Sequence, residues 1–394
     1  MDTDDLKYEL QEETRRGARI KVIGVGGGGS SAVGRMFEEG LDGVQFYVMN
    51  TDAQALASSK VPNKIQIGAR ITHGLGAGSD PQVGREAALE DTERILGILE
   101  GADLVFVTAG LGGGTGAGAS PVVATLAKEL DALTIAVVTT PFSFEGGKRM
   151  RQAERSVNDL ASSVDILTAI PNDRLLSMAP KGMSMAQAFR MADDVLRQAV
   201  MGISEIILTP GTINLDFSDI KAAISGMGRA LIGNAVARGP NAAVEAARAA
   251  INSPLLEDTK IAGARQVLLN ITGSSDIGLH EVNEACSIIR EAAGSDDLQV
   301  NFGLIANDSM GDSVKVTVIA TGFPSPESKR EPVIEVRLPS EFFSDRAPDS
   351  RAAPPVSEHV PPPPVEEPLS MAAAPVFEEE LDVPAYLRKG KMVN

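Results

Sequence analysis

The chain has 394 residues, of which 43% are hydrophobic and 23% charged, a balance typical of a globular protein. At this length we expect two domains, because a single hydrophobic core rarely supports so many residues. The formal net charge of −17 argues against nucleic acid as a partner, since binding phosphate backbones requires a basic face. It also disfavours direct attachment to an anionic membrane.

Several absences restrict the compartment and the cofactors. A single cysteine, Cys286, excludes an internal disulfide framework and indicates a reducing compartment. With only three scattered histidines, a typical zinc site is not expected. The acidic first residues lack the apolar core of a signal peptide, and no apolar run reaches the length of a membrane span. We therefore expect a soluble, cytoplasmic protein without direct membrane insertion.

The first part of the chain alternates short β-rich runs with helical stretches. After a polar, flexible extension over residues 1–18, strands are predicted at 19–25, 44–50, 103–110 and 133–140, and helices from about Ser31 and over 121–130. This alternation predicts an α/β fold: a Rossmann-like, mostly parallel sheet covered by helices on both faces. In such sheets ligands bind beyond the carboxyl ends of the strands, where glycine-rich turns follow here.

A long helix and a smaller domain follow. Apolar residues recur at three- and four-residue steps over 184–208, which predicts one long helix. Periodicity alone leaves open whether Phe189 packs in the core or faces a ligand. Strands at 265–273, 298–306 and 313–323, with a helix over 280–294, indicate a smaller α+β domain over 209–323.

The last part of the chain has a different composition. Residues 324–394 hold 14 of the 23 prolines, which predicts a disordered linker over 324–376. Large apolar residues return in 377–394, as in VFEEELDVPAYLRKGK, and an amphipathic segment after a linker is typical of a docking peptide. A chance hydrophobic patch is the alternative.

The stretch VIGVGGGGSSAVG (residues 22–34) lies between a predicted strand and a predicted helix. Its Gly24-x-Gly26-x-x-Gly29 spacing matches a dinucleotide fingerprint, and Asp52 lies where a ribose-binding acid is expected. By itself the loop is compatible with NAD, with another nucleotide or with a structural turn.

Two further glycine turns favour a polyphosphate over NAD. GLGGGTGAG (110–118) opens a second helix, and Thr115 offers a hydroxyl to a phosphate oxygen or to Mg²⁺. GLGAGSDP (74–81) is positioned to close over a terminal phosphate. The chain contains no Gly-x-x-x-x-Gly-Lys-[Ser/Thr] motif, so it is not a P-loop NTPase.

Polar residues at the next strand ends fit the rest of a nucleotide. In PFSFEGGKR, Glu145 is a candidate for ribose hydroxyls and Arg149 for a phosphate or the base, with a surface ion pair as the alternative. Asn172 follows another strand. Phe189 and Asp193 lie four residues apart on the long helix, so a ring stacking on a purine and a carboxylate accepting from guanine share a face.

Three polar residues in NLDFSD, namely Asn214, Asp216 and Asp219, lie at the junction of the two predicted domains. Carboxylates three residues apart at a helix start face one way, and they suit the positioning of an attacking water or the holding of Mg²⁺. A helix cap is the alternative for either aspartate.

The succession GVGGGG, NTD, GLGAG, GGGTGAG, PFSFEGGKRM, IPND and NLDFSD resembles that of the FtsZ family, the bacterial tubulin-like cell-division GTPases. The resemblance covers roughly residues 19–323, and LDVPAYLR resembles the family's C-terminal peptide. It implies a GTP-binding domain over 19–183, a central helix over 184–208 and a GTPase-activating domain over 209–323.

The resemblance also implies roles for individual residues. Mg²⁺ is expected to be held mainly by the phosphates of the nucleotide. The residues expected to bind this guanine nucleotide, GTP or GDP, are Gly27, Gly28, Gly29, Ser30, Ser31, Gly76, Ala77, Gly78, Gly112, Gly113, Gly114, Thr115, Gly116, Glu145, Arg149, Asn172, Phe189 and Asp193. Asn214, Asp216 and Asp219 are expected to complete catalysis in the neighbouring subunit of a head-to-tail filament at midcell. Membrane-tethering and regulatory division proteins are expected to bind Leu381, Asp382, Val383, Pro384, Tyr386, Leu387 and Arg388.

Two positions depart from the family pattern. Ser31 stands where many relatives have Asn, and its hydroxyl has a shorter reach. Asp80, in GAGSDP rather than GAGANP, places a negative charge in the loop expected near the terminal phosphate, or turns to solvent. Two other functions remain as alternatives: an NAD-dependent oxidoreductase, and a nucleotide-binding scaffold that assembles without hydrolysis.

Overall fold

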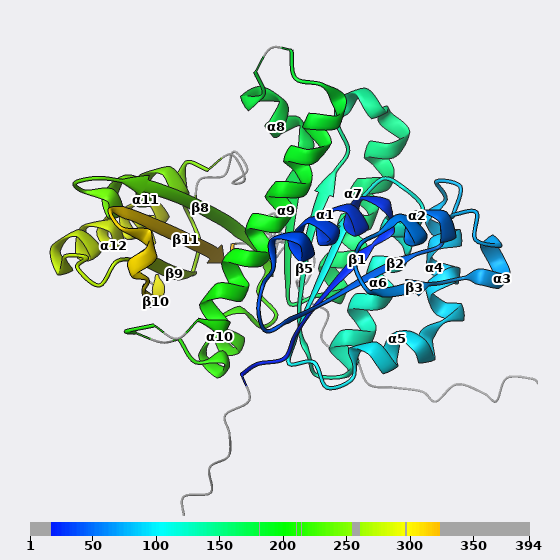
Figure 1. The fold of residues 1–394 in the computed structure, drawn as a ribbon, viewed down its shortest axis with the longest axis horizontal. Coiled ribbons are helices and arrows are strands. Elements are labelled where there is room, and N and C mark those ends of the chain that lie inside the picture. The colour runs from blue at the N-terminus through cyan, green and yellow to red at the C-terminus, as the bar shows by residue number, and fades with distance from the viewer. Residues whose placement is uncertain are drawn as a thin grey trace, which may run out of the picture. The chain divides into compact units, whose positions relative to one another are not determined.

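The computed structural model describes residues 17–323, except Lys181, Pro210, Asn214, residues 254–260 and residues 296–297. Its larger sheet has the strand order β3-β2-β1-β4-β5-β6-β7, with every neighbouring pair parallel (Figure 1). The strands are β1 (Ile20–Val25), β2 (Val44–Asn50), β3 (Asn63–Gln66), β4 (Leu104–Gly110), β5 (Leu133–Thr140), β6 (Ile166–Pro171) and β7 (Gly228–Arg229).

Helices cover both faces of this sheet, and all six residues of β1 are buried, as expected for a strand covered on both sides. One face packs against α1, α2, α8, α9 and α10, the other against α4, α5, α6 and α7. The bounds are α1 (Gly26–Glu39), α2 (Ala53–Ser58), α3 (Ala69–Thr72), α4 (Pro81–Glu90), α5 (Thr92–Leu99), α6 (Thr115–Glu129), α7 (Gly147–Ser163), α8 (Asn172–Met178), α9 (Met185–Leu208) and α10 (Phe217–Ile224).

A second, four-stranded sheet has the order β10-β9-β11-β8. It consists of β8 (Leu231–Arg238), β9 (Gln266–Gly273), β10 (Gln299–Ala306) and β11 (Ser313–Thr321), with α11 (Ala242–Ile251) and α12 (Leu279–Ala293). Side chains alternate along β9: Val267 and Leu269 pack against α11 and α12, whereas Leu268 belongs to the core that contains α9. The predicted fold class is confirmed: a Rossmann-like parallel sheet, a long helix and a smaller α+β part.

Two predicted helix starts were wrong. α1 begins at Gly26 rather than about Ser31, and α6 begins at Thr115 rather than at residue 121. The run Gly26–Gly29 is therefore the first turn of α1, and the run Gly112–Gly114 directly precedes α6. Backbone N–H groups at such helix starts have no partner one turn earlier. Pro121 lies inside α6, where it removes one helical hydrogen bond instead of starting the helix. Within the described part of the chain, no helix combines the length and apolarity needed to cross a bilayer.

Candidate functional site

The strand order places two of the glycine turns beside each other. β1 and β4 are neighbours, and the helices that follow them leave on opposite faces, α1 on one side and α6 on the other. Such a reversal opens a crevice at the carboxyl ends of the two strands, the usual ligand position in this class of sheet.

Glycine is required where α1 and α6 begin. A Cβ on Gly29 would lie 2.3 Å from the Thr108 carbonyl oxygen, and one on Gly26 would lie 2.8 Å from the Gly116 nitrogen. By contrast, a Cβ on Gly27 or on Gly113 would meet nothing within 4 Å. The two turns therefore touch at their base and leave open space above it, bordered by the N-termini of two long helices. Free backbone N–H groups and the helix dipoles make this crevice suited to an anion.

The third glycine turn packs against the second. A Cβ on Gly114 would lie 2.8 Å from the Cβ of Ala77, and Gly76 and Gly78 have φ of 88° and 57°. Asp80, the departure from the family pattern, caps α4, because its carboxylate accepts a hydrogen bond from the Gln82 backbone N–H at 2.9 Å. Its negative charge therefore stabilises the start of α4.

Asp52 has a similar role at the start of α2. Its carboxylate accepts from the backbone N–H groups of Gln54 and Ala55. The residue that suggested a ribose-binding acid is therefore a helix cap.

Two of the predicted nucleotide-binding residues have a buried side-chain oxygen without a hydrogen-bond partner in the described part of the chain. These atoms are Ser30 Oγ in α1 and Asn172 Oδ1, directly after β6. A buried polar atom without a hydrogen bond is costly, so such atoms in a native protein call for an explanation. A phosphate oxygen fits the Ser30 hydroxyl, which can donate, and a hydroxyl or N–H group of a nucleotide fits Asn172 Oδ1, which accepts. Ser31 is exposed on the same helix.

Glu145 and Arg149 bond to each other, as the ion-pair alternative predicted. Arg149 Nη1 lies 2.6 Å from Glu145 Oε2, while Glu145 Oε1 accepts from the Phe142 backbone N–H at 3.0 Å. The Arg149 side chain remains about half exposed, at 48%. The guanidinium retains donors that can meet a ligand.

Phe189 and Asp193 lie on α9, where it packs against α1. The Phe189 ring is 41% exposed and contacts buried Phe142 edge-on at 5.4 Å, so it is not a core residue. Asp193 Oδ2 lies 3.1 Å from Arg35 Nε on α1. Burial raises the pKa of the Asp193 carboxyl to about 6, even though Arg35 lowers it.

Arg35 was missed by sequence reasoning. A signal existed, since Arg35 follows Ser31 by four residues and therefore shares a helix face with it. Both residues also line a cavity of about 480 Å³ together with Gly27 and Arg190. Arg35 thus joins the candidate site through its ion pair with Asp193.

The structure does not bring Asp216 and Asp219 to the glycine turns. Both side chains are exposed at the start of α10, and Asp216 makes no capping hydrogen bond through its side chain. α10 is attached through Lys221, whose Nζ lies 3.0 Å from Asp131 Oδ2 just before β5 begins. The acids therefore lie toward the amino ends of the strands, whereas the glycine turns lie at the carboxyl ends (Figure 1).

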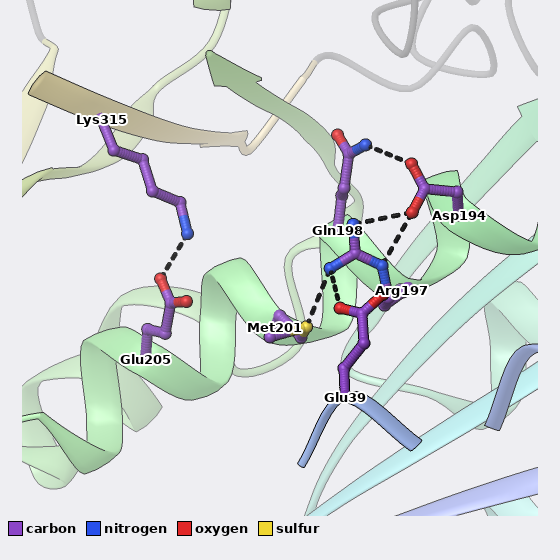
Figure 2. Close-up of polar contacts among 7 residues, drawn as sticks. All are labelled: Glu39, Asp194, Arg197, Gln198, Met201, Glu205 and Lys315. Carbon is purple, nitrogen blue, oxygen red and sulfur yellow. Dashed lines mark hydrogen bonds and ion pairs between the residues drawn. The ribbon is translucent and has the colours of Figure 1, made fainter. Parts of the chain in front are cut away.

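α9 runs between these two regions and is tied to both sheets (Figure 2). Arg197 Nη1 lies 2.8 Å from Glu39 Oε2 at the end of α1, and Arg197 Nη2 lies 2.7 Å from Asp194. Eight residues further along α9, Glu205 pairs with Lys315 of β11. α9 thus contacts both α1, which begins at the first glycine turn, and the second sheet.

Some predicted residues lie outside the described part of the chain. They are Asn214 and the tail positions Leu381, Asp382, Val383, Pro384, Tyr386, Leu387 and Arg388. Among the described residues, no group of three or more His, Cys, Asp or Glu side chains is arranged to hold a metal ion.

Comparisons with known proteins agree with this geometry. Residues 19–180 match the GTPase domain of the Tubulin/FtsZ family, and residues 228–324 match the C-terminal domain of the FtsZ family. An empty FtsZ dimer from M. jannaschii is 40% identical, with a TM-score of 0.71 over 77% of this chain and 88% of that one. A point mutant of FtsZ from the same organism is also 40% identical, with a TM-score of 0.73 over 78% and 92%. GDP-bound CetZ1 from Haloferax volcanii shares the fold at 23% identity, with a TM-score of 0.67 over 78% and 95%.

The fold, the crevice and the family match define a guanine-nucleotide-binding GTPase of the tubulin-like cytoskeletal class. Within that class the chain belongs to the FtsZ family.

Proposed function

We propose that this GTPase binds GTP in the crevice between the starts of α1 and α6 and hydrolyses it only after assembling head to tail. The phosphates would be held by Gly27–Ser31 and by Gly112–Gly116, with the turn at Gly76–Gly78 over the terminal phosphate. The open space at Gly27 and Gly113 and the partnerless Ser30 Oγ support this assignment.

The base and the ribose would lie between α9 and the turn after β5. Phe189 offers an exposed ring for stacking, and Asp193 offers a carboxylate that accepts from both donors on the edge of guanine. Glu145, Arg149 and Asn172 would line the ribose side. Mg²⁺ would be carried mainly by the phosphates, where it neutralises charge that develops during phosphoryl transfer.

The position of Asp216 and Asp219 carries the proposal of hydrolysis between subunits. α9 has 24 residues, and the 15 helical steps from Asp193 to its last residue, Leu208, span about 22 Å at the rise of an α-helix. α10 begins beyond that end, so these carboxylates and the glycine turns of one chain belong to opposite ends of the subunit. A second subunit added head to tail would supply the acids to the nucleotide of the first.

The wider role we propose is that of a filament in the bacterial division ring. Residues 19–183 would bind the nucleotide, 184–208 would connect the two parts, and 209–323 would activate hydrolysis in the next subunit. The tail at 377–394 would recruit membrane-tethering and regulatory division proteins to midcell. The related FtsZ from M. jannaschii is described as a dimer, and CetZ2 from Haloferax volcanii as a protofilament.

Sedimentation and phosphate release measured together, with GTP against GDP, test the proposal over a range of protein concentrations. GTP should promote sedimentation, and the rate of phosphate release should rise more than linearly with protein concentration. Release that is linear at all concentrations would contradict hydrolysis between subunits. Assembly with GTP but without phosphate release would instead indicate a scaffold.

A further inference from the structure

Two buried hydroxyl groups join separate parts of the candidate site. Thr51 follows β2, Thr115 opens α6, and their Oγ1 atoms lie 2.7 Å apart, although the two residues are 64 positions apart in the chain. Thr51 is 0% exposed and Thr115 is 9% exposed. In such a pair only one of the two hydroxyl hydrogens lies between the oxygens.

The direction of this hydrogen bond follows from what each hydroxyl can reach. Within the described part of the chain, Thr115 Oγ1 is the one hydrogen-bond partner found for the Thr51 hydroxyl. If Thr115 donated, the hydrogen of Thr51 would remain unpaired in the protein interior, which is unfavourable. The arrangement in which Thr51 donates avoids this cost, and it leaves the hydrogen of Thr115 available to a ligand in the crevice.

The free hydrogen of Thr115 has no acceptor in its own helix. A threonine inside a helix can donate to the carbonyl one turn earlier, but Thr115 is the first residue of α6. Its neighbours also restrict its movement. A Cβ on Gly84 would lie 3.1 Å from Thr115 Cα, and a Cβ on Gly26 would lie 3.5 Å from Thr115 Cβ.

We infer that Thr51 is a positioning residue of the GTPase site. By donating to Thr115, it turns the Thr115 hydrogen toward a phosphate oxygen of the nucleotide in the crevice. A hydroxyl that donates to an anionic oxygen makes a stronger hydrogen bond than one between neutral groups. This inference rests on the proposed function, because it requires phosphates between α1 and α6.

GDP affinity, measured by titration calorimetry with Mg²⁺ on the full chain, tests the inference. Thr115→Val removes the donor and should weaken GDP binding roughly tenfold or more, as expected for a hydrogen bond to a charged group. Thr51→Val preserves the shape but removes the orienting hydrogen, and should weaken binding about threefold. Thr51→Ser should restore binding, and the double variant Thr51→Val/Thr115→Val should bind as Thr115→Val does.

The control is Thr317→Val, a buried threonine of β11 in the second sheet, which should leave GDP affinity unchanged. Thr51→Ala replaces Thr51→Val if the valine variant does not fold. Additive losses in the double variant, unchanged GDP affinity in a folded Thr51 variant, or no recovery with Thr51→Ser would overturn the inference. Normal GDP binding by Thr115→Val would overturn it too, while concentration-dependent phosphate release would still support the proposed function.

Discussion

Asp193 is the residue that we expect to distinguish guanine from other bases. A carboxylate accepts from the N1–H and the amino group of guanine, whereas the amide of Asn presents one acceptor and one donor. Asp193→Asn should therefore bind GTP at least about tenfold more weakly and bind xanthosine triphosphate more tightly than the unmodified chain does. Competition binding with the two nucleotides measures the change. An Asn variant that still prefers GTP would show that another residue reads the base.

The buried carboxyl of Asp193, when ionised, also destabilises the folded state of the nucleotide-free subunit. Its pKa is about 6 in the folded chain, above the ordinary value of 3.8, so the folded state binds this proton more tightly than the unfolded state does. The contribution of this carboxyl to the free energy of unfolding should therefore be highest below about pH 4 and fall by about 2 to 3 kcal/mol between about pH 4 and pH 6.

Urea unfolding of Asp193→Asn and of the unmodified chain, at pH 4 and at pH 7, isolates this contribution. The variant should be the more stable of the two at pH 7, with a smaller advantage at pH 4. An equal difference in the free energy of unfolding at both pH values would contradict the burial argument.

Gly113 is the glycine at which a side chain should block the nucleotide without disturbing the fold. A Cβ there meets no protein atom within 4 Å, so valine would extend into the space that we assign to phosphates. Gly113→Val should lower GTP affinity at least about tenfold while the melting temperature of the nucleotide-free chain stays close to normal.

Gly97→Val, in α5, is the matched control because a Cβ on Gly97 also meets no atom within 4 Å. It should bind GTP normally. Normal GTP binding by Gly113→Val would show that the phosphates do not bind at this turn.

At the scale of elements, ion pairs hold α9 at two positions along its length, Arg197 and Glu205 (Figure 2). Lys315 and Glu205 are 19% and 27% exposed, so removing the lysine leaves a mostly buried carboxylate unpaired. Lys315→Met should lower the free energy of unfolding by about 1 to 2 kcal/mol, less than for a fully buried pair.

Lys60→Met is the comparison, since Lys60 pairs with Glu38 on the surface, where the two side chains are 74% and 46% exposed. Its effect should stay below about 0.5 kcal/mol. Equal effects of the two substitutions in urea unfolding would show that the Lys315 pair does not stabilise the attachment of β11 to α9.

The elements differ in how far the sequence predicts them. β1, β4 and β5 were predictable because buried parallel strands are continuous apolar runs bounded by turns. β3 and β7 are short and partly exposed, so they carry no such run. The starts of α1 and α6 were misplaced because glycine has a low helix propensity, and only the contact between the two turns shows why it is needed there.

The same limit applies to the site. The glycine turns, Asn172 and the Phe189–Asp193 pair follow from local spacing and strand ends. Arg35 and Thr51 do not, because their importance comes from contacts with α9 and α6, far away in the sequence. The caps formed by Asp52 and Asp80 are local, but an aspartate before a helix reads equally well as a ligand for ribose or as a cap.

At the scale of the whole molecule, the central claim is that one nucleotide site needs two chains. The α9 geometry predicts that acids and glycine turns act in trans, so two defective variants should complement each other. Asp219→Ala retains the glycine turns and loses an acid, whereas Gly113→Val retains the acids and loses the nucleotide. Each variant alone should release almost no phosphate from GTP.

Phosphate release by a mixture of these two variants is the most direct test. In a random copolymer of equal amounts of the two variants, about a quarter of the head-to-tail contacts would pair an intact glycine turn with an intact acid, so activity should reappear on mixing. Activity that reappears only in the mixture, at a fixed total protein concentration, is the result that a site shared between two chains predicts. An inactive mixture that still forms copolymers, or an Asp219→Ala variant that hydrolyses GTP normally by itself, would contradict it.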